Sequence, residues 1–529
     1  MFKVLVSDPI SDQGIQQLTD AADVQVDKKT GLTEDELTAI IGEYDALLVR
    51  SQTKVTRKIM EAGKQLKVVG RAGVGVDNID LNAATDLGII VINAPDGNTI
   101  TTCEHTFAMM MALARHIPQA YAKTVTGEWD RKTFLGVELR NKVLGVLGMG
   151  RIGSEVAKRA KAFGMEILGF DPFLTEERAE KLGVKLATVD DIIRHADFIT
   201  VHTPLTKETR HMIARPQFEV MKKGMRIINC ARGGIIDELA LVEAIDEGIV
   251  AGAAFDVFEE EPPRADHPFL KHPKIIVTPH LGASTVEAQE NVAIDVSEQV
   301  LHILRNEPFI NAVNMPSVAP DLLKKIQPYF TLGEKLGQFA AQMADGAVHE
   351  IVVNYSGALS DLDTNPLTRY VVTGVLSRHL AEQVNVVNSM HMAKTRDLNV
   401  VIQKSSASQG FTNLITITLK GKNEERIVSG TLLTGYGERV TQIDQYPVDV
   451  APEGNLILVQ HNDKPGIIGK VGTLLGNSHV NIATMQVGRK VVGGSAIMIL
   501  SVDKRASKEV LEDLVKLPEL NAAKEIIFI

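Results

Sequence analysis

Short apolar runs alternate with helical patterns throughout the amino-terminal half of the chain. Gly, Pro or Asp bounds each run, and this alternation is typical of parallel sheets built from βαβ units. We therefore expect two such sheets. The strands expected in the first are Val4–Asp8, Val24–Asp27, Ala46–Ser51, Val68–Arg71 and Ile89–Asn93. Those expected in the second are Val143–Leu147, Glu166–Phe170, Ala196–His202, Arg226–Ala231, Ala251–Val257 and Ile275–Thr278.

Two longer helical patterns connect these predicted sheets. The first covers Thr101–Ile117, and Thr101 with Glu104 has the spacing of a capping box. The second begins near Ser284, which forms the same pattern with Glu287. It is expected to return the chain to the first sheet.

The pattern changes in the carboxyl-terminal half. Asn311–Pro320 is expected to be a linker, Leu322–Ala344 a helix, and Ala347–Tyr355 and Leu414–Leu419 strands. After Pro452 a β-α-β-β-α-β pattern predicts a ferredoxin-like unit. Its expected pieces are Leu456–His461, Gly466–Gly476, Asn481–Val487, Ser495–Val502, Lys508–Leu517 and Glu525–Ile529.

Length, charge and cysteine usage narrow the class of protein. A chain of 529 residues is too long for one hydrophobic core, so three or four domains are expected. The net charge of -10 argues against nucleic-acid binding. The first residues form a strand pattern without a signal peptide, and no apolar run reaches transmembrane length. With only two cysteines, Cys103 and Cys230, the chain is expected to be cytoplasmic, off the membrane and free of disulfides.

A glycine-rich turn follows the strand Val143–Leu147. Gly148, Gly150 and Gly153 form a G-x-G-x-x-G run that leads directly into a helical pattern, the arrangement that holds a pyrophosphate at a helix N-terminus. Asp171 ends the next strand, where a carboxylate accepts hydrogen bonds from ribose hydroxyls and disfavours a 2′-phosphate. The pattern predicts a site for NAD. The alternative is a plain turn followed by an incidental aspartate.

Three polar residues near the ends of later strands have the side-chain types that oxidation of a hydroxyl group needs. His280 is a candidate acid/base, Glu261 a candidate partner that orients it, and Arg232 a candidate clamp for a substrate carboxylate. Taken singly, His280 can be an ordinary loop histidine and Glu261 a solvated acid. Glu259 and Glu260 are neighbouring alternatives to Glu261.

Three motifs around these residues resemble one family. Asn229–Gly234, Asp256–Pro262 and Pro279–Ser284 are similar to signatures of the D-isomer-specific 2-hydroxyacid dehydrogenases, and Arg71–Asp77 matches as well. The resemblance extends over the whole chain to members that carry an intervening domain and a regulatory ACT domain. It implies the roles given above for His280, Glu261 and Arg232. It also implies a cofactor site formed by Gly148, Gly150, Arg151, Ile152, Gly153, Asp171, His202, Thr203, Cys230, Ala231, Asp256, Gly282 and Ala283. No metal is expected.

The resemblance also predicts the domain plan. A flavodoxin-like substrate domain, or lid, is expected over 1–97 and 287–315, and a Rossmann NAD domain over 98–286. Both are doubly wound α/β units. An α+β intervening domain is expected over 316–452 and the ACT domain over 453–529.

Substrate and effector follow from the same resemblance. It implies oxidation of 3-phosphoglycerate to 3-phosphohydroxypyruvate, the committed step of serine synthesis. Candidate substrate ligands are Arg50, Lys54, Arg71, Ala72 and Gly73. Candidate ligands for L-serine are Asp463 and Asn481, which are expected to meet beside a helix that Asp463 caps, across a dimer interface. A homodimer or homotetramer is expected.

Two other functions are compatible with the sequence. The substrate of the dehydrogenase can be glycerate, hydroxypyruvate or another 2-hydroxy acid; the cations at Arg50, Lys54 and Arg71 argue against an unphosphorylated one. Alternatively, the chain is an NAD-sensing interaction protein that has lost turnover. Reduction of 2-oxoglutarate as a second activity cannot be predicted from the sequence.

Overall fold

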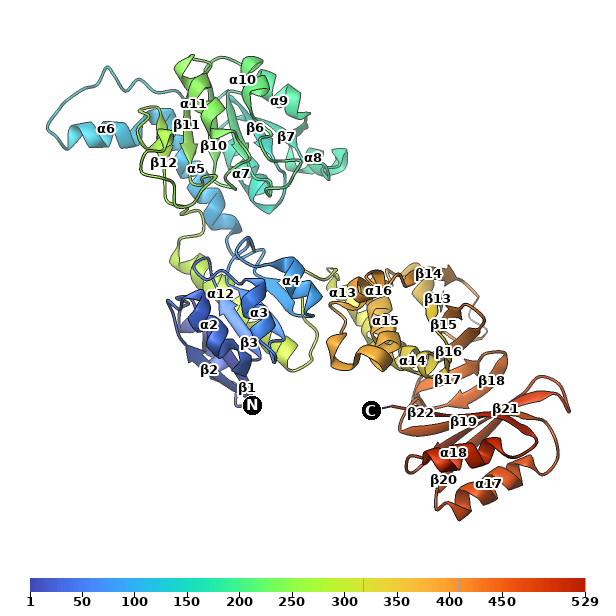
Figure 1. Ribbon diagram of the computed structural model, residues 1–529. Coiled ribbons are helices and arrows are strands. Elements are labelled where there is room, and N and C mark those ends of the chain that lie inside the picture. Colours follow the sequence, from blue (N-terminus) through green and yellow to red (C-terminus); the bar gives the residue numbers. More distant parts are fainter. Residues whose placement is uncertain (317, 408–409, 529) are drawn as a thin grey trace.

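Four sheets follow one another along the chain in the computed structural model, which describes residues 1–316, 318–407 and 410–528 (Figure 1). The first two are parallel, the third is mixed and the fourth is antiparallel. Two long helices, α5 (Thr99–Arg115) and α12 (Val286–Leu304), connect the first two units. Within the described residues, we find no helix with both the length and the apolar character that a membrane span requires.

The first sheet has the strand order β2-β1-β3-β4-β5, which is the doubly wound order of flavodoxin-like folds. Its strands are β1 (Phe2–Val6), β2 (Val24–Lys28), β3 (Ala46–Val49), β4 (Val68–Arg71) and β5 (Ile90–Asn93). One core lies between the sheet and α1 (Gln16–Thr19) with α12. The other lies under α2 (Glu34–Ile40), α3 (Arg57–Ala62) and α4 (Leu81–Asp86). The helix after Thr285 therefore returns to the first sheet, as expected.

The second sheet has the order β12-β11-β10-β9-β6-β7-β8, so the strand order reverses between β6 and β9. Ligands of such folds bind at that reversal, beyond the carboxyl ends of the strands. The strands are β6 (Val143–Leu147), β7 (Glu166–Phe170), β8 (Lys185–Leu186), β9 (Phe198–Val201), β10 (Met225–Asn229), β11 (Val250–Phe255) and β12 (Ile275–Val277). The helices are α5, α6 (Ile117–Thr124), α7 (Arg151–Ala162), α8 (Glu176–Leu182), α9 (Val189–His195), α10 (Arg215–Glu219) and α11 (Glu238–Asp246).

Both predicted capping boxes on the connecting helices are wrong. Helix α5 begins two residues before Thr101, after Asn98, and has no side-chain cap. The Thr101 hydroxyl lies instead 3.3 Å from the hydroxyl of Thr285. Helix α12 is capped by Thr285, which accepts from the Ala288 N–H at 3.2 Å. Ser284 belongs to the preceding turn, because its N–H donates to the Leu281 carbonyl.

The third sheet has the order β14-β13-β15-β16-β17-β18 and packs against two helices. The predicted helix over Leu322–Ala344 is present, but a 3-10 turn at Gln327–Tyr329, which contains Pro328, divides it in two. The helices are α13 (Pro320–Ile326), α14 (Phe330–Met343), α15 (Asn365–Leu380) and α16 (Ser389–Lys394). The strands are β13 (Val348–Gly357), β14 (Asn399–Ser405), β15 (Asn413–Gly421), β16 (Glu425–Leu433), β17 (Gly437–Ile443) and β18 (Tyr446–Val450).

The fourth sheet, order β20-β21-β19-β22, is the predicted ferredoxin-like unit. Its elements are β19 (Asn455–Asn462), α17 (Ile467–Asn477), β20 (Ile482–Arg489), β21 (Ser495–Val502), α18 (Lys508–Val515) and β22 (Leu520–Ile527). The last strand begins at Leu520, earlier than predicted, and Ile529 lies outside the described residues. One face packs under α17 and α18, and the other shares a core with α14 and α15.

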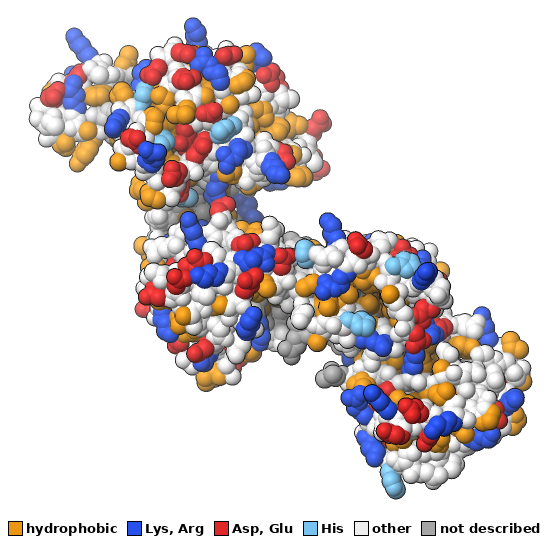
Figure 2. All heavy atoms as spheres, in the orientation of Figure 1, with side chains coloured by type: hydrophobic (Ala, Val, Ile, Leu, Met, Phe, Trp, Pro, Cys, Tyr) orange, Lys and Arg blue, Asp and Glu red, His pale blue; other side chains and the backbone are white. Residues whose placement is uncertain are grey.

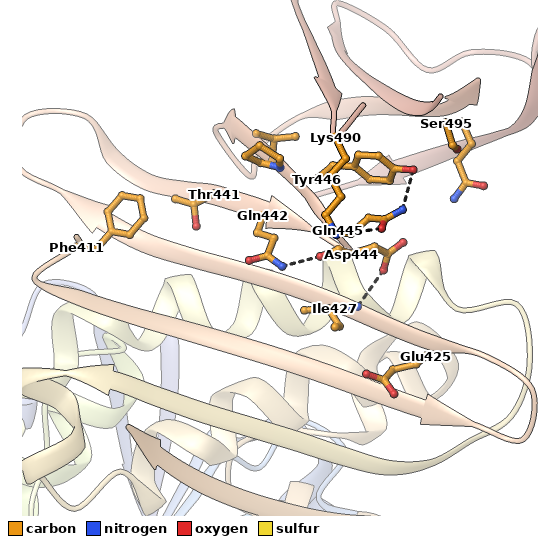
Figure 3. A pocket seen from close by; sticks show the side chains of 13 residues that line it. Phe411, Glu425, Ile427, Thr441, Gln442, Asp444, Gln445, Tyr446, Lys490 and Ser495 are labelled. Atoms are coloured by element: carbon orange, nitrogen blue, oxygen red, sulfur yellow. Dashed lines mark hydrogen bonds between the residues drawn. The ribbon is translucent and has the colours of Figure 1, made fainter. Parts of the chain in front are cut away.

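A cavity of about 890 Å³ lies where the third and fourth sheets meet (Figure 3). Asp444, Tyr446, Lys490 and Ser495 are among the side chains that line it. Its polar groups bond to one another: Gln445 donates to the Tyr446 hydroxyl at 3.0 Å. The cavity is separate from the strand ends that carry the candidate catalytic residues.

Candidate active site

The glycine turn after β6 has the shape of a pyrophosphate cradle. Gly148 has φ 98°, a conformation that favours glycine, and a Cβ at Gly153 would lie 2.0 Å from the Gly148 carbonyl oxygen. A Cβ at Gly150 would meet open space. Gly150 precedes α7 without a side-chain cap, so the first N–H groups of this helix face that space. The chain therefore has room and donors for an anion at this turn.

The residues around the turn fit NAD. Asp171 follows β7 and accepts the Met149 N–H at 3.0 Å, which places its carboxylate beside the turn. His202 Nδ1 and Thr203 Oγ1, after β9, are buried without a protein partner among the described residues. Burial lowers the pKa of His202 to about 4, so its imidazole is neutral at pH 7. Buried polar atoms of this kind usually have a partner, which a bound cofactor would supply.

Most other predicted cofactor ligands line the same strand ends. Burial raises the pKa of the Cys230 thiol, which is consequently an uncharged part of the wall. The Ala231 N–H donates to the Asn229 side chain at 3.0 Å. Arg151, at the start of α7, forms an ion pair with Asp96, and Ile152 follows it in the first turn. Ala283 follows Gly282 in the loop before α12.

His280 and Glu261 lie together although 19 residues separate them. His280 Nδ1 is 2.7 Å from Glu261 Oε2, and the other carboxylate oxygen accepts the Phe258 N–H at 3.1 Å. Burial raises the pKa of Glu261. The hydrogen bond and charge of His280 lower it by more than burial raises it, so the net pKa is below its usual value. Glu259 bonds His211 instead, at 2.8 Å. Of the two acids, Glu261 is the partner of His280.

Asp256 holds the loop that carries His280. Its carboxylate, with no exposed side-chain surface, accepts the N–H groups of Leu281 at 2.7 Å and Gly282 at 2.8 Å. Its backbone carbonyl accepts the His280 N–H at 2.9 Å. The family resemblance placed Asp256 only in the cofactor site, and a contact with the cofactor stays a prediction.

The two glycines after Arg232 meet two different backbone requirements. A Cβ at Gly233 would lie 1.8 Å from the Phe258 carbonyl oxygen, so this glycine allows two backbone segments to touch. The contact joins the segment of Arg232 to the segment that leads to Glu261. Gly234 adopts φ 78°. Close packing explains Gly233, and the left-handed backbone conformation explains Gly234.

Cations from both parallel-sheet units meet near Arg232. Its Nε lies 3.2 Å from Asp77 of the first unit. Arg71, at the end of β4, is largely buried and donates to the Gly75 carbonyl. The pKa of Arg71 is lowered to about 10. Burial is the largest cause, and the positive charges of Arg232 and Arg50 also contribute. Arg71 therefore remains charged at pH 7, and together with the guanidiniums of Arg232 and Arg50 it makes this a site for an anion.

The loop of Arg50 and Lys54 is anchored by two residues that sequence reasoning missed. Asp8 accepts the N–H groups of Arg50 at 2.6 Å and Thr53 at 3.1 Å. The Asn78 side chain donates to the Arg50 and Thr53 carbonyls, each at 2.7 Å. The position of Asp8 just after the first strand was the available signal. Lys54 itself is exposed.

The turn after Arg71 is tightly bonded. The Ala72 N–H donates to the Val49 carbonyl at 2.8 Å, and the Gly73 carbonyl accepts the Ala94 N–H at 3.0 Å. These bonds join the ends of β3, β4 and β5. Ala72 and Gly73 therefore lie at the same sheet edge as the Arg50 loop.

The two predicted serine ligands do not meet within one chain. Asn462 pairs with Ser495 and Ile482 with Val502, so the end of β19 and the start of β20 lie at opposite ends of β21. Asp463 accepts from Arg489 at 2.8 Å and Gly493 at 3.1 Å, whereas Asn481 donates to Asp503. Asp463 also does not cap α17, because Gly466 precedes that helix.

Comparisons with known proteins match this description. Residues 107–282 match the NAD-binding domain of the D-isomer specific 2-hydroxyacid dehydrogenases, 325–444 the D-3-phosphoglycerate dehydrogenase intervening domain, and 455–519 the ACT domain. The chain is 47% identical to D-3-phosphoglycerate dehydrogenase of Bacillus subtilis, covering 99% of both chains. It is 47% identical to the Methanocaldococcus jannaschii protein of that name, covering 98% of both.

Solved structures match the first two units. An Aquifex aeolicus D-lactate dehydrogenase complexed with NAD and lactic acid is 28% identical, with a TM-score of 0.51 over 58% of this chain and 96% of that one. A glyoxylate reductase from Paecilomyes thermophila is 30% identical, with a TM-score of 0.54 over 59% and 98%.

Fold and site together define an NAD-dependent dehydrogenase of the D-isomer specific 2-hydroxyacid class. Within that class, the chain belongs to the D-3-phosphoglycerate dehydrogenase family.

Proposed function

We propose that the protein oxidises the C2 hydroxyl of 3-phosphoglycerate to the ketone of 3-phosphohydroxypyruvate. The observation that carries this proposal is the group of Arg232, Arg71 and Arg50, because a substrate with both a carboxylate and a phosphate needs several fixed cations. The two relatives named D-3-phosphoglycerate dehydrogenase support the same substrate. The product would enter serine synthesis, and we propose a cytoplasmic location.

Each residue would have a distinct role. His280 would take the hydroxyl proton while the hydride leaves C2, and Glu261 would orient the imidazole and stabilise its charged form. Arg232 would hold the carboxylate, whereas Arg50, Lys54 and Arg71 with the backbone of Ala72 and Gly73 would bind the phosphate end. NAD, when bound, supplies the hydride acceptor. Residues 1–97 with 287–315 would then act as the lid over the NAD domain, 98–286.

Initial rates of NADH formation test the substrate. We expect turnover with 3-phosphoglycerate and NAD at alkaline pH, with a ketone trap present, and a much lower kcat/KM with glycerate because the phosphate contacts are lost. Equal kcat/KM values for the two acids would contradict the proposal. Absence of turnover with any 2-hydroxy acid, combined with tight NAD binding, would favour the NAD-sensing alternative.

We propose that L-serine regulates this activity through a site formed by two copies of the chain. Strand β20 is at the edge of its sheet and has no paired strand on its outer side within the described residues, although its end at Gly488 packs against β18. Antiparallel pairing of two β20 edges would bring the start of one β20 to the end of the other. Because Arg489, at the end of β20, contacts Asp463, Asn481 of the partner subunit would then lie near Asp463.

Mixed assemblies test the shared site. We expect serine to suppress turnover of the native protein, and D463A or N481A alone to be insensitive. Assemblies refolded from both variants together should regain part of the inhibition, because one intact site re-forms between unlike copies. Mixtures as insensitive as each variant alone would show that both residues act within one chain.

We propose a second contact between copies at the segment around α6. Figure 2 shows hydrophobic side chains gathered on this protruding segment, and Tyr121, Trp129 and Leu135 are 70%, 82% and 86% exposed. Exposed apolar clusters of this kind mark interaction sites. We expect W129A with Y121A to sediment as a smaller species than the native protein. F173A removes a side chain that is equally exposed, at 86%, and should leave the size unchanged.

A further inference from the structure

His105 contacts the network beneath the His280 loop. It lies in the second turn of α5, the helix that connects the first two units, and its side chain is 19% exposed. Its Nε2 is 3.1 Å from Asp256 Oδ1 and 3.2 Å from Thr278 Oγ1. Neither the glycine turn nor the cation group includes His105. Its partner Asp256, however, bonds three consecutive residues of the catalytic loop.

The backbone of the His280 loop depends on Asp256. The Asp256 backbone carbonyl accepts the His280 N–H at 2.9 Å, and the Asp256 carboxylate accepts the N–H groups of Leu281 and Gly282 at 2.7 and 2.8 Å. His280 itself has φ 54°, in the left-handed region that L residues rarely occupy. Such a conformation persists only where surrounding bonds impose it. The Asp256 bonds therefore hold the backbone from which the His280 side chain extends, while Glu261 bonds the ring itself.

The Asp256 carboxylate in turn depends on its donors. Burial raises the pKa of Asp256. The hydrogen bonds from His105 and Thr278 lower it by more than burial raises it, so the net pKa lies below the ordinary value. Asp256 is therefore ionised and acts only as an acceptor. A buried carboxylate that loses one donor is destabilised, because no water replaces that donor.

Helix α5 bonds the same loop at two further points. Thr102 donates to the Gly282 carbonyl at 2.9 Å, and the Thr101 hydroxyl lies 3.3 Å from that of Thr285. Three side chains of α5 thus contact the loop. His105 contacts Thr278 before His280, and Thr102 contacts Gly282 just after it. Thr101 contacts Thr285 at the end of the loop. One face of the first turns of α5 serves as a rigid support for the loop.

We propose that His105 is a positioning residue for the dehydrogenase reaction: its Nε2–H holds the Asp256 carboxylate, which holds the His280 loop in its left-handed conformation. The inference rests on the proposed role of His280. If His280 has that role, His105 affects how well the His280 ring is oriented toward the hydroxyl proton. It does not touch substrate or cofactor.

Three variants test this role. H105L removes the donor and keeps the volume, whereas H105Q retains an N–H near the position of Nε2. The matched control is H272L, because His272 is also mostly buried, at 13% exposed, and bonds Asp246 at 3.3 Å away from the loop. Two measurements are made on the full chain: steady-state kcat and KM, and hydrogen exchange of peptides that contain the amides of residues 280–282.

H105L is expected to lower kcat at least tenfold with KM changed less than twofold, and to speed exchange of the loop amides about tenfold. H105Q is expected to restore both measurements to within about threefold of the native values, and H272L to leave them unchanged. The proposal is overturned if H105L matches H272L in both. It is also overturned if H105Q restores loop protection but leaves kcat as low as in H105L.

Hydrogen exchange separates this inference from the proposed substrate, because it needs no turnover. If the native protein oxidises another 2-hydroxy acid instead of 3-phosphoglycerate, kcat is measured with that acid and the expectation for H105L is the same. If no acid is oxidised, the role of His280 fails and the catalytic part of this inference fails with it, whereas the exchange rates of H105L still show whether His105 holds the loop.

Discussion

Replacing His280 with alanine is expected to lower kcat by about a thousandfold while NAD still binds. A positioned acid/base group contributes on the order of 10² to 10⁴ in rate, and His280 is bonded to Glu261 at 2.7 Å in the arrangement that such a group needs. NAD binding should survive, because the glycine turn and Asp171 lie on β6 and β7, away from β12. Steady-state kinetics and titration of NAD by fluorescence measure the two effects separately.

The control for this variant is E261Q. Its amide oxygen replaces the acceptor for His280 but the charge and the acceptor for the Phe258 N–H are lost, and kcat is expected to fall less than in H280A. Glu261 is ionised above its lowered pKa, and the charge is therefore present throughout the working pH range. An H280A protein with native kcat would refute the assignment. Equal losses of kcat and NAD affinity would instead indicate a disturbed cofactor site.

Substituting Gly150 is expected to weaken NAD binding strongly without unfolding the protein. The Cβ of valine at this position meets no protein atom within 4 Å, so the fold should tolerate it. The same Cβ points into the space where the pyrophosphate would approach the backbone. We expect G150V to raise the Kd for NAD about a hundredfold, or about 2.7 kcal/mol. Isothermal titration and the thermal midpoint check affinity and stability.

Gly153 provides the opposite case in the same turn. A Cβ there would lie 2.0 Å from the Gly148 carbonyl oxygen, so G153A should lower the thermal midpoint as well as the affinity. If G150V destabilised the fold as much as G153A, the open space at Gly150 would not be reserved for a ligand. If G150V bound NAD normally, the pyrophosphate would have to lie elsewhere.

Local chemistry made much of the first two units predictable. Buried parallel strands are continuous apolar runs, and β6 and β7 begin and end where the pattern predicts. The glycine turn could be recognised because glycine is needed at each of these positions for a local reason, either the backbone conformation or the space that must stay free. His280, Glu261 and Arg232 could be named as candidates because few residue types suit their chemistry. Choosing Glu261 over its neighbours required the family resemblance.

Helix starts and the carboxyl-terminal half were predicted less well. Thr101 and Ser284 have the spacing of caps, but α5 begins two residues before Thr101, and the residue after Ser284, Thr285, caps α12. Strands β14 and β16 to β18 were not predicted, because strands in a mixed sheet have weaker patterns than buried parallel ones. The orientation of β19 and β20, which separates Asp463 from Asn481, depends on pairing between distant segments.

The sequence by itself determined the order of the units, the cofactor and the residue types of the reaction, because these depend on short segments whose patterns are local. Only the tertiary structure decided which groups act together. It bonded Glu261 to His280 and Glu259 to His211, placed Arg71 near Arg232, and put His105 and Asp256 beneath the catalytic loop. These contacts join residues that are far apart along the chain, and a contact of that kind forms only when the sheets bring strand ends to a common edge.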